Sequence, residues 1–588
     1  MKDKKLSIME EEQIFSPWRT AFINFKARKV SVIAVFVFLF LFLSCMILPI
    51  FFPLDVNFHD VTQQNIPPGR TMLNVPPEMA NNAKMISVGS TFSVGIDNNG
   101  NVHQWGIYPP VVETFYPVRS NRLTHIPEDM GRLKIVSAGL DHIIAVSEDN
   151  RVYTWGNIRH MLTNIPDNVH GRNIIQMEAG HQVSTALCDE GIIYVWGNTN
   201  FVSIEPRALQ GRIKQYALNT STVIALIDDG SVAALTPRDF PFVDIPESIG
   251  HNAVQVATTD RAAAALLNDG TVVVWGNVEY GEELIPPHIQ GRIVSITGGR
   301  NHFSALLNDG SVFSWGRNDK GQTRFPNVSG KTFVETGYYQ NFAIDSAGNI
   351  TAWGFRGYLM GSDDLGRDIF LRLIFAGRLS MTIGMIAVVI AAIIGVIVGG
   401  ISGYYAGIVD IILMRVAEVV GSMPFLVLCV ILSAIIGNAF SETGRVVFIM
   451  VLLGLLSWPG LSRMTRAQFL AERENEYVTA ARAVGIKEAV IIFRHILPNI
   501  FPIILVNLTL MLAGSMLTEA GLSFVGFGIR EPNPTWGNML MACVNSNVIA
   551  NLWWRWVFPA AALGLTVLSI NTIGDGFRDA IDPKSNER

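Results

Sequence analysis

One stretch of the sequence has residue types and spacing that predict a short helical hairpin and offer no group for covalent chemistry. Residues 476–498 read EYVTAARAVGIKEAVIIFRHILP. Glu476, Ala480 and Ala481 fall on one face of a helix, because residues four apart are neighbours there. Gly485 can end that helix, since glycine adopts the left-handed conformation without a steric penalty. The stretch predicts a short helix and a turn, with small residues at the bend.

A second amphipathic turn follows the glycine, and Pro498 is expected to stop it. Its apolar side chains share one helical face; they are Ala489, Val490, Phe493, Ile496 and Leu497. The whole stretch resembles the EAA loop of ATP-binding-cassette importer permeases, whose pattern is EAA, three residues, Gly, nine residues and Ile-x-Leu-Pro. The spacing from Gly485 to Leu497-Pro498 is kept, whereas His495 stands where the family pattern has Ile.

In that family the loop is a coupling helix that sits in a groove of a separate ATPase subunit. The resemblance implies the same role here. The residues that would carry it are Glu476, Ala480, Ala481, Arg482, Gly485, Leu497 and Pro498. An ordinary cytosolic helical hairpin is the alternative interpretation, because short motifs also occur by chance.

Enzymatic chemistry finds no support in the sequence. A Walker A motif is missing, since Gln322 replaces the phosphate-binding lysine in the one stretch with matching glycines. The four cysteines are scattered and the eleven histidines dispersed, so we expect neither a metal site nor a disulfide framework. We expect no cofactor in this chain, with ATP bound by partner subunits. The net charge of −5 gives no indication of nucleic-acid binding.

The composition indicates more than one domain and partial immersion in lipid. The chain has 588 residues, of which 16% are charged, against about 25% in ordinary soluble domains, and its mean hydropathy is +0.33. Residues 30–52 carry no charge and suffice to cross a bilayer. The lysines and arginines before them place the N-terminus in the cytoplasm. Residues 1–29 are expected to include a helix on the inner membrane surface, with a disordered tail as the alternative.

Between residues 75 and 354 the chain repeats a unit of roughly 40 residues, a period typical of propeller blades. Each unit crosses a hairpin turn and most end in Trp-Gly, at Trp105, Trp155, Trp196, Trp275, Trp315 and Trp353. A unit around Asp229-Gly230 has lost that pair. The count of seven units predicts a closed all-β propeller over residues 66–356. The pattern resembles the regulator-of-chromosome-condensation family, whose propellers serve as binding surfaces for unrelated partners.

After the propeller, residues 361–381 read GSDDLGRDIFLRLIFAGRLSM. This is very similar to the segment before the second span in the C-type permease subunit of dipeptide and oligopeptide importers. Five further apolar segments follow, at about 379–405, 411–436, 446–461, 500–517 and 557–573. The loop 463–499 is rich in arginine and is therefore expected in the cytoplasm. Arg378, Arg415 and Glu418 lie near span ends and are interpreted as reaching the membrane surface.

The sequence therefore predicts an α-helical polytopic membrane protein of six spans with an inserted seven-bladed propeller. The permease core would occupy residues 361–579. The protein would lie in the plasma or inner membrane, with both termini in the cytoplasm and the propeller on the extracytoplasmic side. Resemblance implies a permease subunit of an ATP-binding-cassette importer, working by alternating access. Expected partners are two ATPase subunits, a second permease subunit, an extracytoplasmic substrate-binding protein and membrane lipid, with no nucleic acid.

Peptide cargo is implied by the resemblance alone, and related permeases also carry nickel and other small solutes. The propeller would dock a binding protein or surface partner, capture substrate itself, or act as a spacer. A membrane-anchored propeller receptor is the rival from another class. It would leave the 476–498 loop without a role.

Overall fold

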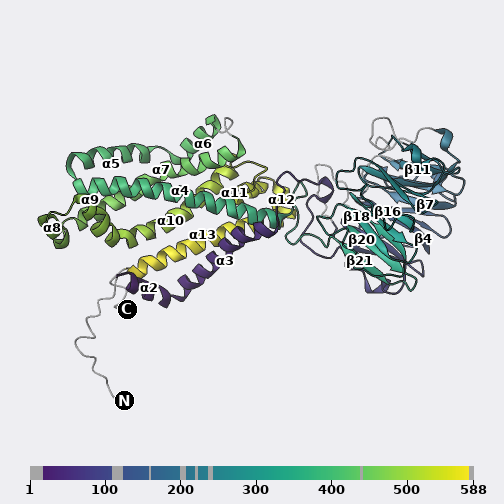
Figure 1. The fold of residues 1–588 in the computed structure, drawn as a ribbon, viewed down its shortest axis with the longest axis horizontal. Coiled ribbons are helices and arrows are strands. Elements are labelled where there is room, and N and C mark those ends of the chain that lie inside the picture. Colours follow the sequence, from purple (N-terminus) through teal and green to yellow (C-terminus); the bar gives the residue numbers. More distant parts are fainter. Residues whose placement is uncertain are drawn as a thin grey trace, which may run out of the picture. The chain divides into compact units, whose positions relative to one another are not determined.

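The chain folds into a helical unit and an all-β unit, seen in a computed structural model (Figure 1). The structure describes residues 17–108, 123–157, 161–198, 207–218, 223–235, 243–436 and 441–581. The helical unit is built from residues 1–58 and 369–588, and the β unit from residues 59–368. Residues 1–16 of the expected N-terminal segment lie outside the described part.

Within the described residues, the β unit contains seven antiparallel sheets of three strands each, in simple meander order. Their strands are β1 (Ala83–Val88), β2 (Phe92–Asp97) and β3 (Val102–Gly106); β4 (Leu133–Ala138), β5 (His142–Ser147) and β6 (Val152–Gly156); β7 (Ile174–Ala179), β8 (Val183–Cys188) and β9 (Ile193–Gly197); β10 (Ile213–Leu218), β11 (Val223–Ile227) and β12 (Val232–Leu235); β13 (Ala253–Thr258), β14 (Ala262–Leu267) and β15 (Val272–Gly276); β16 (Ile293–Gly298), β17 (His302–Leu307) and β18 (Val312–Gly316); and β19 (Lys331–Thr336), β20 (Gln340–Asp345) and β21 (Ile350–Gly354).

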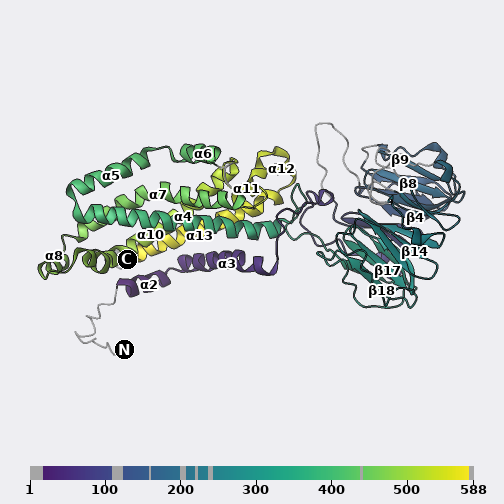
Figure 2. The same ribbon diagram turned by 45° about the horizontal axis from the view of Figure 1, so that its top comes forward.

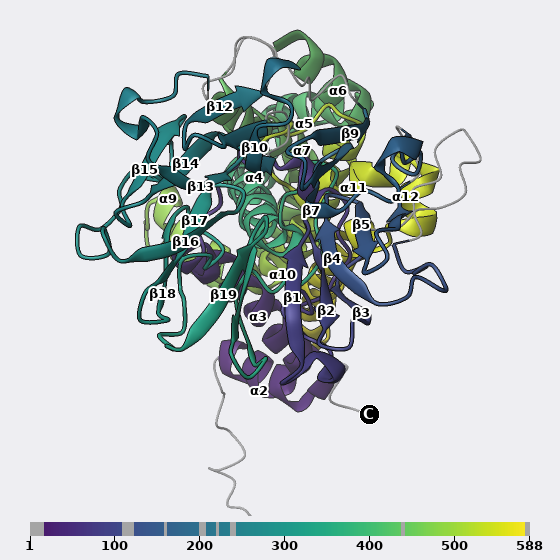
Figure 3. The same ribbon diagram turned by 90° about the vertical axis from the view of Figure 1, so that its right-hand side faces the viewer.

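The first strands of the sheets form a ring (Figure 3). Each contacts the first strand of the next sheet, and β19 of the last sheet contacts β1 of the first. Closing the ring leaves each sheet with a neighbour on both sides, which is how propellers avoid exposed edges. The predicted seven-bladed propeller is confirmed.

The repeated Trp-Gly pairs are structural. All six tryptophans are buried, and three donate an indole N–H to a backbone carbonyl of the preceding connection, such as Trp315 Nε1 to Glu282 O at 2.7 Å. The following glycines have positive φ, as do the hairpin glycines such as Gly270 at 78°. In the unit that lacks Trp-Gly, the buried Leu235 takes the place of the tryptophan. A smaller apolar residue therefore fills the same core position.

The two ends of the inserted unit are joined to each other. Residues 60–72 run beside 356–365 through backbone hydrogen bonds, including Asn65 N to Asp363 O at 2.8 Å and Gly69 N to Tyr358 O at 2.9 Å. The sequence-based range of 66–356 omits most of this pairing, because the paired segments carry no blade repeat. Since both ends leave the propeller together, the unit can be inserted between two consecutive membrane helices.

The helical unit consists of α2 (Pro17–Ala27), α3 (Lys29–Phe51), α4 (Ile369–Tyr405), α5 (Gly407–Ser422), α6 (Phe425–Ile436), α7 (Glu442–Glu472), α8 (Glu476–Ala483), α9 (Glu488–Val490), α10 (Leu497–Phe524), α11 (Trp536–Leu540), α12 (Ser546–Asn551) and α13 (Trp554–Ile581). Helices α4 and α7 pack along each other, as do α10 with α13 and α13 with α3 (Figure 2). Phe25 of α2 stacks on Phe577 of α13 at 4.5 Å. The predicted surface helix thus packs on the C-terminal end of the bundle.

Five helices of the described residues are long and apolar enough to cross a membrane. They correspond to the first, second, fourth, fifth and sixth predicted spans. The last four helices are longer than predicted, because the predicted spans were uncharged segments whereas each helix continues past the charged residues at its ends. The third predicted span, 411–436, is divided into α5 and α6. Pro424 explains the break, since a proline disfavours helical conformation in the residue before it. The polytopic fold class is confirmed, and the prediction of one unbroken third span is wrong.

The glycines of the second span allow close packing of two helices. At Gly399 an added Cβ would lie 2.4 Å from Ser462 O, and at Gly403 it would lie 2.6 Å from Arg466 O. These glycines let α4 and α7 approach backbone to backbone, as small residues do in membrane helices. Helix α4 continues through them and runs for 37 residues.

Candidate functional site

The 476–498 stretch folds as a hairpin between α7 and α10. Helix α8 ends at Ala483 with Val484 as its C-cap, and Gly485 follows with φ of 81°. Gly485 N donates to Arg482 O at 3.0 Å and Ile486 N to Ala481 O at 3.1 Å. These two bonds are the pattern by which a left-handed residue satisfies the last carbonyls of a helix. The predicted role of Gly485 as a helix terminator is confirmed.

The second half of the hairpin differs from the prediction. Pro498 does not stop a helix, because it lies at the first turn of α10, which continues to Phe524. A π-helical turn over Ile491–Ile496 precedes it, in which Leu497 N bonds to Ile492 O. Proline is tolerated in a first helical turn, where its missing N–H is not needed. The expectation that Pro498 ends the second turn is therefore wrong.

The π-helical turn also changes which apolar side chains are buried. Ile491 and Ile496 are buried against Phe469 and Tyr404, whereas Ala489, Val490 and Phe493 are exposed. The wider spacing of this turn moves Phe493 away from the face that a regular helix would give, whereas Ala489 and Val490 precede the turn and are exposed independently of it. Of the predicted apolar face, Ile496 alone is buried and Leu497 is half-buried.

The two alanines of the motif have different surroundings. Ala481 is buried with Val478 in a cluster formed with the neighbouring helices, whereas Ala480 and Glu476 are exposed. The sequence also departs from the family pattern here, since Thr479 precedes the alanines and Glu476 lies one turn earlier. Ala481 therefore holds the hairpin onto its own chain, and Ala480 is available to a partner.

The carboxyl end of α4 fixes the hairpin. The Arg482 guanidinium lies over the Tyr404 ring at 4.9 Å, and Arg482 Nε donates to Tyr404 Oη at 3.4 Å. Arg473 Nη1 donates to Tyr404 O at 3.3 Å, and Tyr405 Oη donates to Glu488 Oε2 at 2.9 Å. Both halves of the hairpin are thus attached to the last turn of α4.

The outer side of the hairpin is apolar and open. Val484 is 81% exposed and Phe493 62%, with Ile486 and Val490 also exposed. An atom added at Gly485 would meet no other atom within 4 Å. Exposed apolar patches of this kind mark interaction surfaces. We name Ala480, Val484, Gly485, Ile486, Val490 and Phe493 the outer hairpin surface.

Charged groups that the sequence analysis passed over bind helices together near their ends. Arg466 of α7 forms a bidentate ion pair with Asp410 of α5, with Arg466 Nη2 2.6 Å from Asp410 Oδ2. At the start of α4, the buried Arg372 pairs with Glu531 at 2.9 Å. Of the three charges singled out earlier, Arg415 and Glu418 form an exposed pair with each other, and Arg378 is exposed. That these three groups reach the membrane surface stays a prediction.

The one carboxylate inside α10 was also missed. Glu519 is fully buried and accepts hydrogen bonds from Ser380 Oγ at 3.0 Å and Ser523 Oγ at 2.7 Å. Trp536 N donates to the same Ser380 hydroxyl at 3.3 Å, so this contact joins α4, α10 and α11. A single acidic residue in an otherwise uncharged span is a signal that sequence reasoning could have used.

A cavity of about 350 Å³ lies inside the propeller and a second of about 320 Å³ lies in the helical unit. The second one is bounded by α6, α7 and α10, and its lining has hydroxyl, thioether and apolar groups without a charge: Phe425, Leu453, Ser457, Met511, Gly514, Ser515 and Thr518. Neutral polar groups between helices suit the passage of a solute through an apolar bundle.

Comparison with known proteins assigns both units. The family model "Binding-protein-dependent transport system inner membrane component" matches residues 392–587, and "N-terminal TM domain of oligopeptide transport permease C" matches 16–68. A peptide permease protein of Brucella ovis is 41% identical over 243 residues, which are 41% of this chain and 76% of the relative. This chain belongs to the family of binding-protein-dependent transport permeases. The predicted family is confirmed.

Other relatives agree with this assignment. The oligopeptide transport system permease protein OppC of Escherichia coli is 39% identical over 39% of this chain and 73% of its own length. The dipeptide permease protein DppC of Bacillus subtilis is 38% identical over 38% and 68%. These homologues are non-enzymatic transporter subunits, and family membership implies ATPase and further permease subunits as partners. The permease is a multi-pass membrane protein.

The propeller matches the regulator of chromosome condensation repeat over residues 134–157 and 293–322. Among solved structures, the CRINKLY ectodomain of an Arabidopsis thaliana receptor kinase aligns with a TM-score of 0.34 at 16% identity, over 46% of this chain and 96% of that one. The inward-facing MetNI methionine transporter aligns with a TM-score of 0.30 at 20% identity, over 36% and 98%. We infer nothing from alignments at these scores.

Proposed function

We propose that this permease imports peptides by alternating access, driven by separate ATPase subunits that dock on the outer hairpin surface. ATP is bound by those subunits, and the present chain contributes no cofactor. The observation that carries the proposal is the hairpin itself. It presents exposed apolar side chains, and Arg482 and Glu488 fix it to the end of α4.

The attachment to α4 explains how a docked subunit would act on the membrane helices. Tyr404 and Tyr405 close a helix of 37 residues, which is about 55 Å long at 1.5 Å per residue. Its close packing on α7 means that a displacement of the hairpin would move α4 and α7 together. The uncharged cavity between α6, α7 and α10 lies beside α7 and would change with that movement.

The ends of the helices support the proposed sides of the membrane. Helix α2, the C-terminal end of α13 and the hairpin α8 lie at one end of the helical unit (Figures 1 and 2). Helix α4 begins directly after the propeller and ends at the hairpin, so their points of attachment are at opposite ends of one helix. With the arginine-rich loop in the cytoplasm, both termini are cytoplasmic and the propeller is extracytoplasmic.

Peptides are proposed as cargo because the relatives are peptide permeases. Such a pore needs a second permease chain, and the resemblance implies an extracytoplasmic substrate-binding protein. The propeller would serve as the outer module on which that protein docks. Propellers commonly present binding surfaces of this kind.

Co-purification with the ATPase tests the coupling role. Full-length chain would be isolated from its native membrane in mild detergent, as native protein and as Ala480→Glu and Val484→Glu variants. Ala550→Glu is the matched control, because Ala550 is also an exposed helical alanine but lies in α12. We expect the native chain and the control to retain an ATPase subunit, and the two hairpin variants to lose it.

Transport by the same preparations tests the rest of the proposal. Reconstituted with its partners, the native chain should take up labelled dipeptide when ATP is supplied, and the hairpin variants should not. Retention of ATPase by both hairpin variants would overturn the docking site. Recovery of a surface protein with the propeller, but never of an ATPase, would instead favour a membrane-anchored receptor.

A further inference from the structure

The central channel of the propeller is a cavity of about 350 Å³ enclosed by the seven first strands. The fifth residue of each of these strands occupies an equivalent register position, and all seven of these residues line the channel. In chain order they are Ser87, Ser137, Glu178, Ala217, Ala257, Thr297 and Glu335. Two carboxylates therefore share one level of an otherwise neutral ring of side chains.

Oxygen atoms at this register position normally bind the neighbouring blade. Ser87 Oγ accepts from Ala138 N at 3.0 Å, and Ser137 Oγ accepts from Ala179 N at 2.9 Å. Glu178 Oε2 accepts from Leu218 N at 2.6 Å, while Glu178 Oε1 accepts from Gln176 Nε2 at 2.7 Å. The hydrogen-bonding capacity of Glu178 is thus largely used to hold two blades together.

Glu335 departs from this pattern. Its carboxylate lines the channel, and no side-chain hydrogen bond or ion pair to it occurs among the residues that the structure describes. Glu335 is half-buried, and it faces the channel that it lines. An ionised carboxylate accepts hydrogen bonds at both oxygens. Glu335 is therefore available to a ligand.

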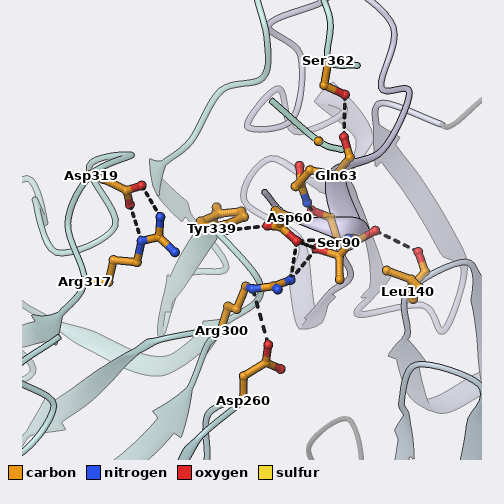
Figure 4. Close-up of polar contacts among 12 residues, drawn as sticks. Asp60, Gln63, Ser90, Leu140, Asp260, Arg300, Arg317, Asp319, Tyr339 and Ser362 are labelled. Carbon is orange, nitrogen blue, oxygen red and sulfur yellow. Dashed lines mark hydrogen bonds and ion pairs between the residues drawn. The ribbon is translucent and has the colours of Figure 1, made fainter. Parts of the chain in front are cut away.

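Among the described residues, Arg300 is the one arginine or lysine that lines the channel, and its charge is already paired. Arg300, at the end of the channel where residues 60–63 pack, lies 2.8 Å from Asp60 and 3.4 Å from Asp260 (Figure 4). Burial raises the pKa of Glu178 and of Glu335 to about 8, and the charge of Glu178 adds to the shift of Glu335. The other titratable groups that line the channel are His181, Tyr216, Asp260, Arg300 and Tyr338. Above about pH 8, a cation entering the channel would meet two ionised carboxylates, because Arg300 is already paired with Asp60 and Asp260.

We propose that the central channel binds the primary ammonium group of a small organic cation, held by Glu335 and by the charge of Glu178. An ammonium offers three N–H donors, which suit the free carboxylate of Glu335 and the hydroxyls at the same level. The alanines at 217 and 257 leave room for an alkyl chain. A divalent metal is less suited, because calcium takes six to eight oxygen ligands and no group of three or more acidic, histidine or cysteine side chains is placed to hold a metal among the described residues.

This inference concerns the propeller alone and stands apart from transport. The test is isothermal titration of the purified full-length chain in detergent at pH 8.5, with n-butylammonium chloride as the probe and n-butanol as its uncharged counterpart. We expect binding of the ammonium and none of the alcohol. Glu335→Gln should weaken binding by about tenfold or more, since it removes a charged hydrogen-bond partner. Glu247→Gln, an exposed glutamate of another blade, is the matched control and should bind as the native chain does.

A second variant guards against a folding defect in Glu335→Gln. Ala257→Lys would place an ammonium of the chain itself in the channel, at the position where Glu178 and Glu335 show that a long side chain fits. It should abolish binding of the probe while Glu335 remains, and raise the melting temperature. Equal binding by native chain and Glu335→Gln would overturn the proposal, as would equal binding of butanol. Absence of ammonium binding, or calcium binding in its place, would overturn it as well.

Discussion

The propeller and the helical bundle bury polar groups in different ways. In the propeller, each polar group belongs to a repeated position, and the neighbouring blade usually supplies its partner. Gln176, Gln215 and Gln255 show this clearly: each amide both donates to and accepts from the backbone of the next blade's first strand. In the bundle, polar groups such as Glu519 occur singly, and each has a different set of partners.

A residue with unusual hydrogen bonding is therefore easier to recognise in the propeller than in the bundle. Because seven equivalent positions show what a residue at the fifth position of a first strand does, the missing partner of Glu335 is visible by comparison. The bundle has no repeats, so a residue such as Glu519 can be interpreted through its own contacts only. If the difference is general, the propeller should depend on contacts shared between its segments, and the bundle should depend on individual contacts.

The largest effect is expected where a buried ion pair joins Asp60, at the start of the β unit, to Arg300 between β16 and β17. Arg300→Met would leave Asp60 buried without its cation, and breaking such a pair costs about 3–5 kcal/mol. Hydrogen exchange of residues 59–66 should become much faster, while the helical unit stays unchanged. Arg261→Met, which breaks an exposed pair with Glu279, should change stability by less than about 1 kcal/mol. Unchanged exchange in Arg300→Met would show that backbone pairing alone holds the segment.

In the bundle, the largest loss of stability is expected when the packing of the buried Ala481 in the hairpin is disrupted. Ala481→Glu would place a charge in the cluster of Val478 and Phe469 and should cost about 3 kcal/mol. Ala480→Glu, one residue earlier and exposed, should cost less than about 0.5 kcal/mol. Hydrogen exchange of residues 476–500 measures both. Equal protection in the two variants would contradict the inner and outer faces assigned to the hairpin.

The next largest effect is expected on how the stability of the propeller depends on pH. It tests whether Glu335 differs from the residues at equivalent positions. Its pKa is about 8 in the folded chain and 4.5 for an ordinary glutamate. Between these values the unfolded chain loses a proton that the folded chain keeps, so stability falls as pH rises through this window. Glu335→Gln should remove roughly 1–3 kcal/mol of that fall. Thermal unfolding of the propeller from pH 4.5 to 8.5 measures it, and an unchanged slope would place another group behind the shift.

The sequence was most informative where its pattern was periodic. The Trp-Gly pairs and hairpin glycines predicted seven blades because each satisfies one local requirement of backbone conformation or packing. Gly485 was interpretable for the same reason. The position of Pro498 was not, since the π-helical turn before it depends on tertiary packing of Ile491 and Ile496. Glu335 differs from Glu178 in part through a local residue, because Gln176 donates to Glu178 whereas Phe333 occupies the equivalent position before Glu335. The second bond to Glu178, from Leu218 N, comes from the neighbouring strand and could not be predicted from the local sequence.

The smallest effect is expected at the joint between the hairpin and α4. Tyr404→Phe keeps the aromatic ring over which Arg482 lies at 4.9 Å and removes only the 3.4 Å hydrogen bond to its hydroxyl. Stability should fall by less than about 1 kcal/mol, and docked ATPase should be retained.

Tyr404→Leu removes the cation–π contact as well, worth about 0.5–2 kcal/mol. If this single ring transmits movement, Tyr404→Leu should lower the number of dipeptides imported per ATP hydrolysed more than Tyr404→Phe does. Equal ratios in both variants would mean that the remaining hydrogen bonds, from Arg473 to Tyr404 O and from Tyr405 to Glu488, are sufficient to transmit the movement. The bundle would then depend on several contacts at this joint, as the propeller does between its blades.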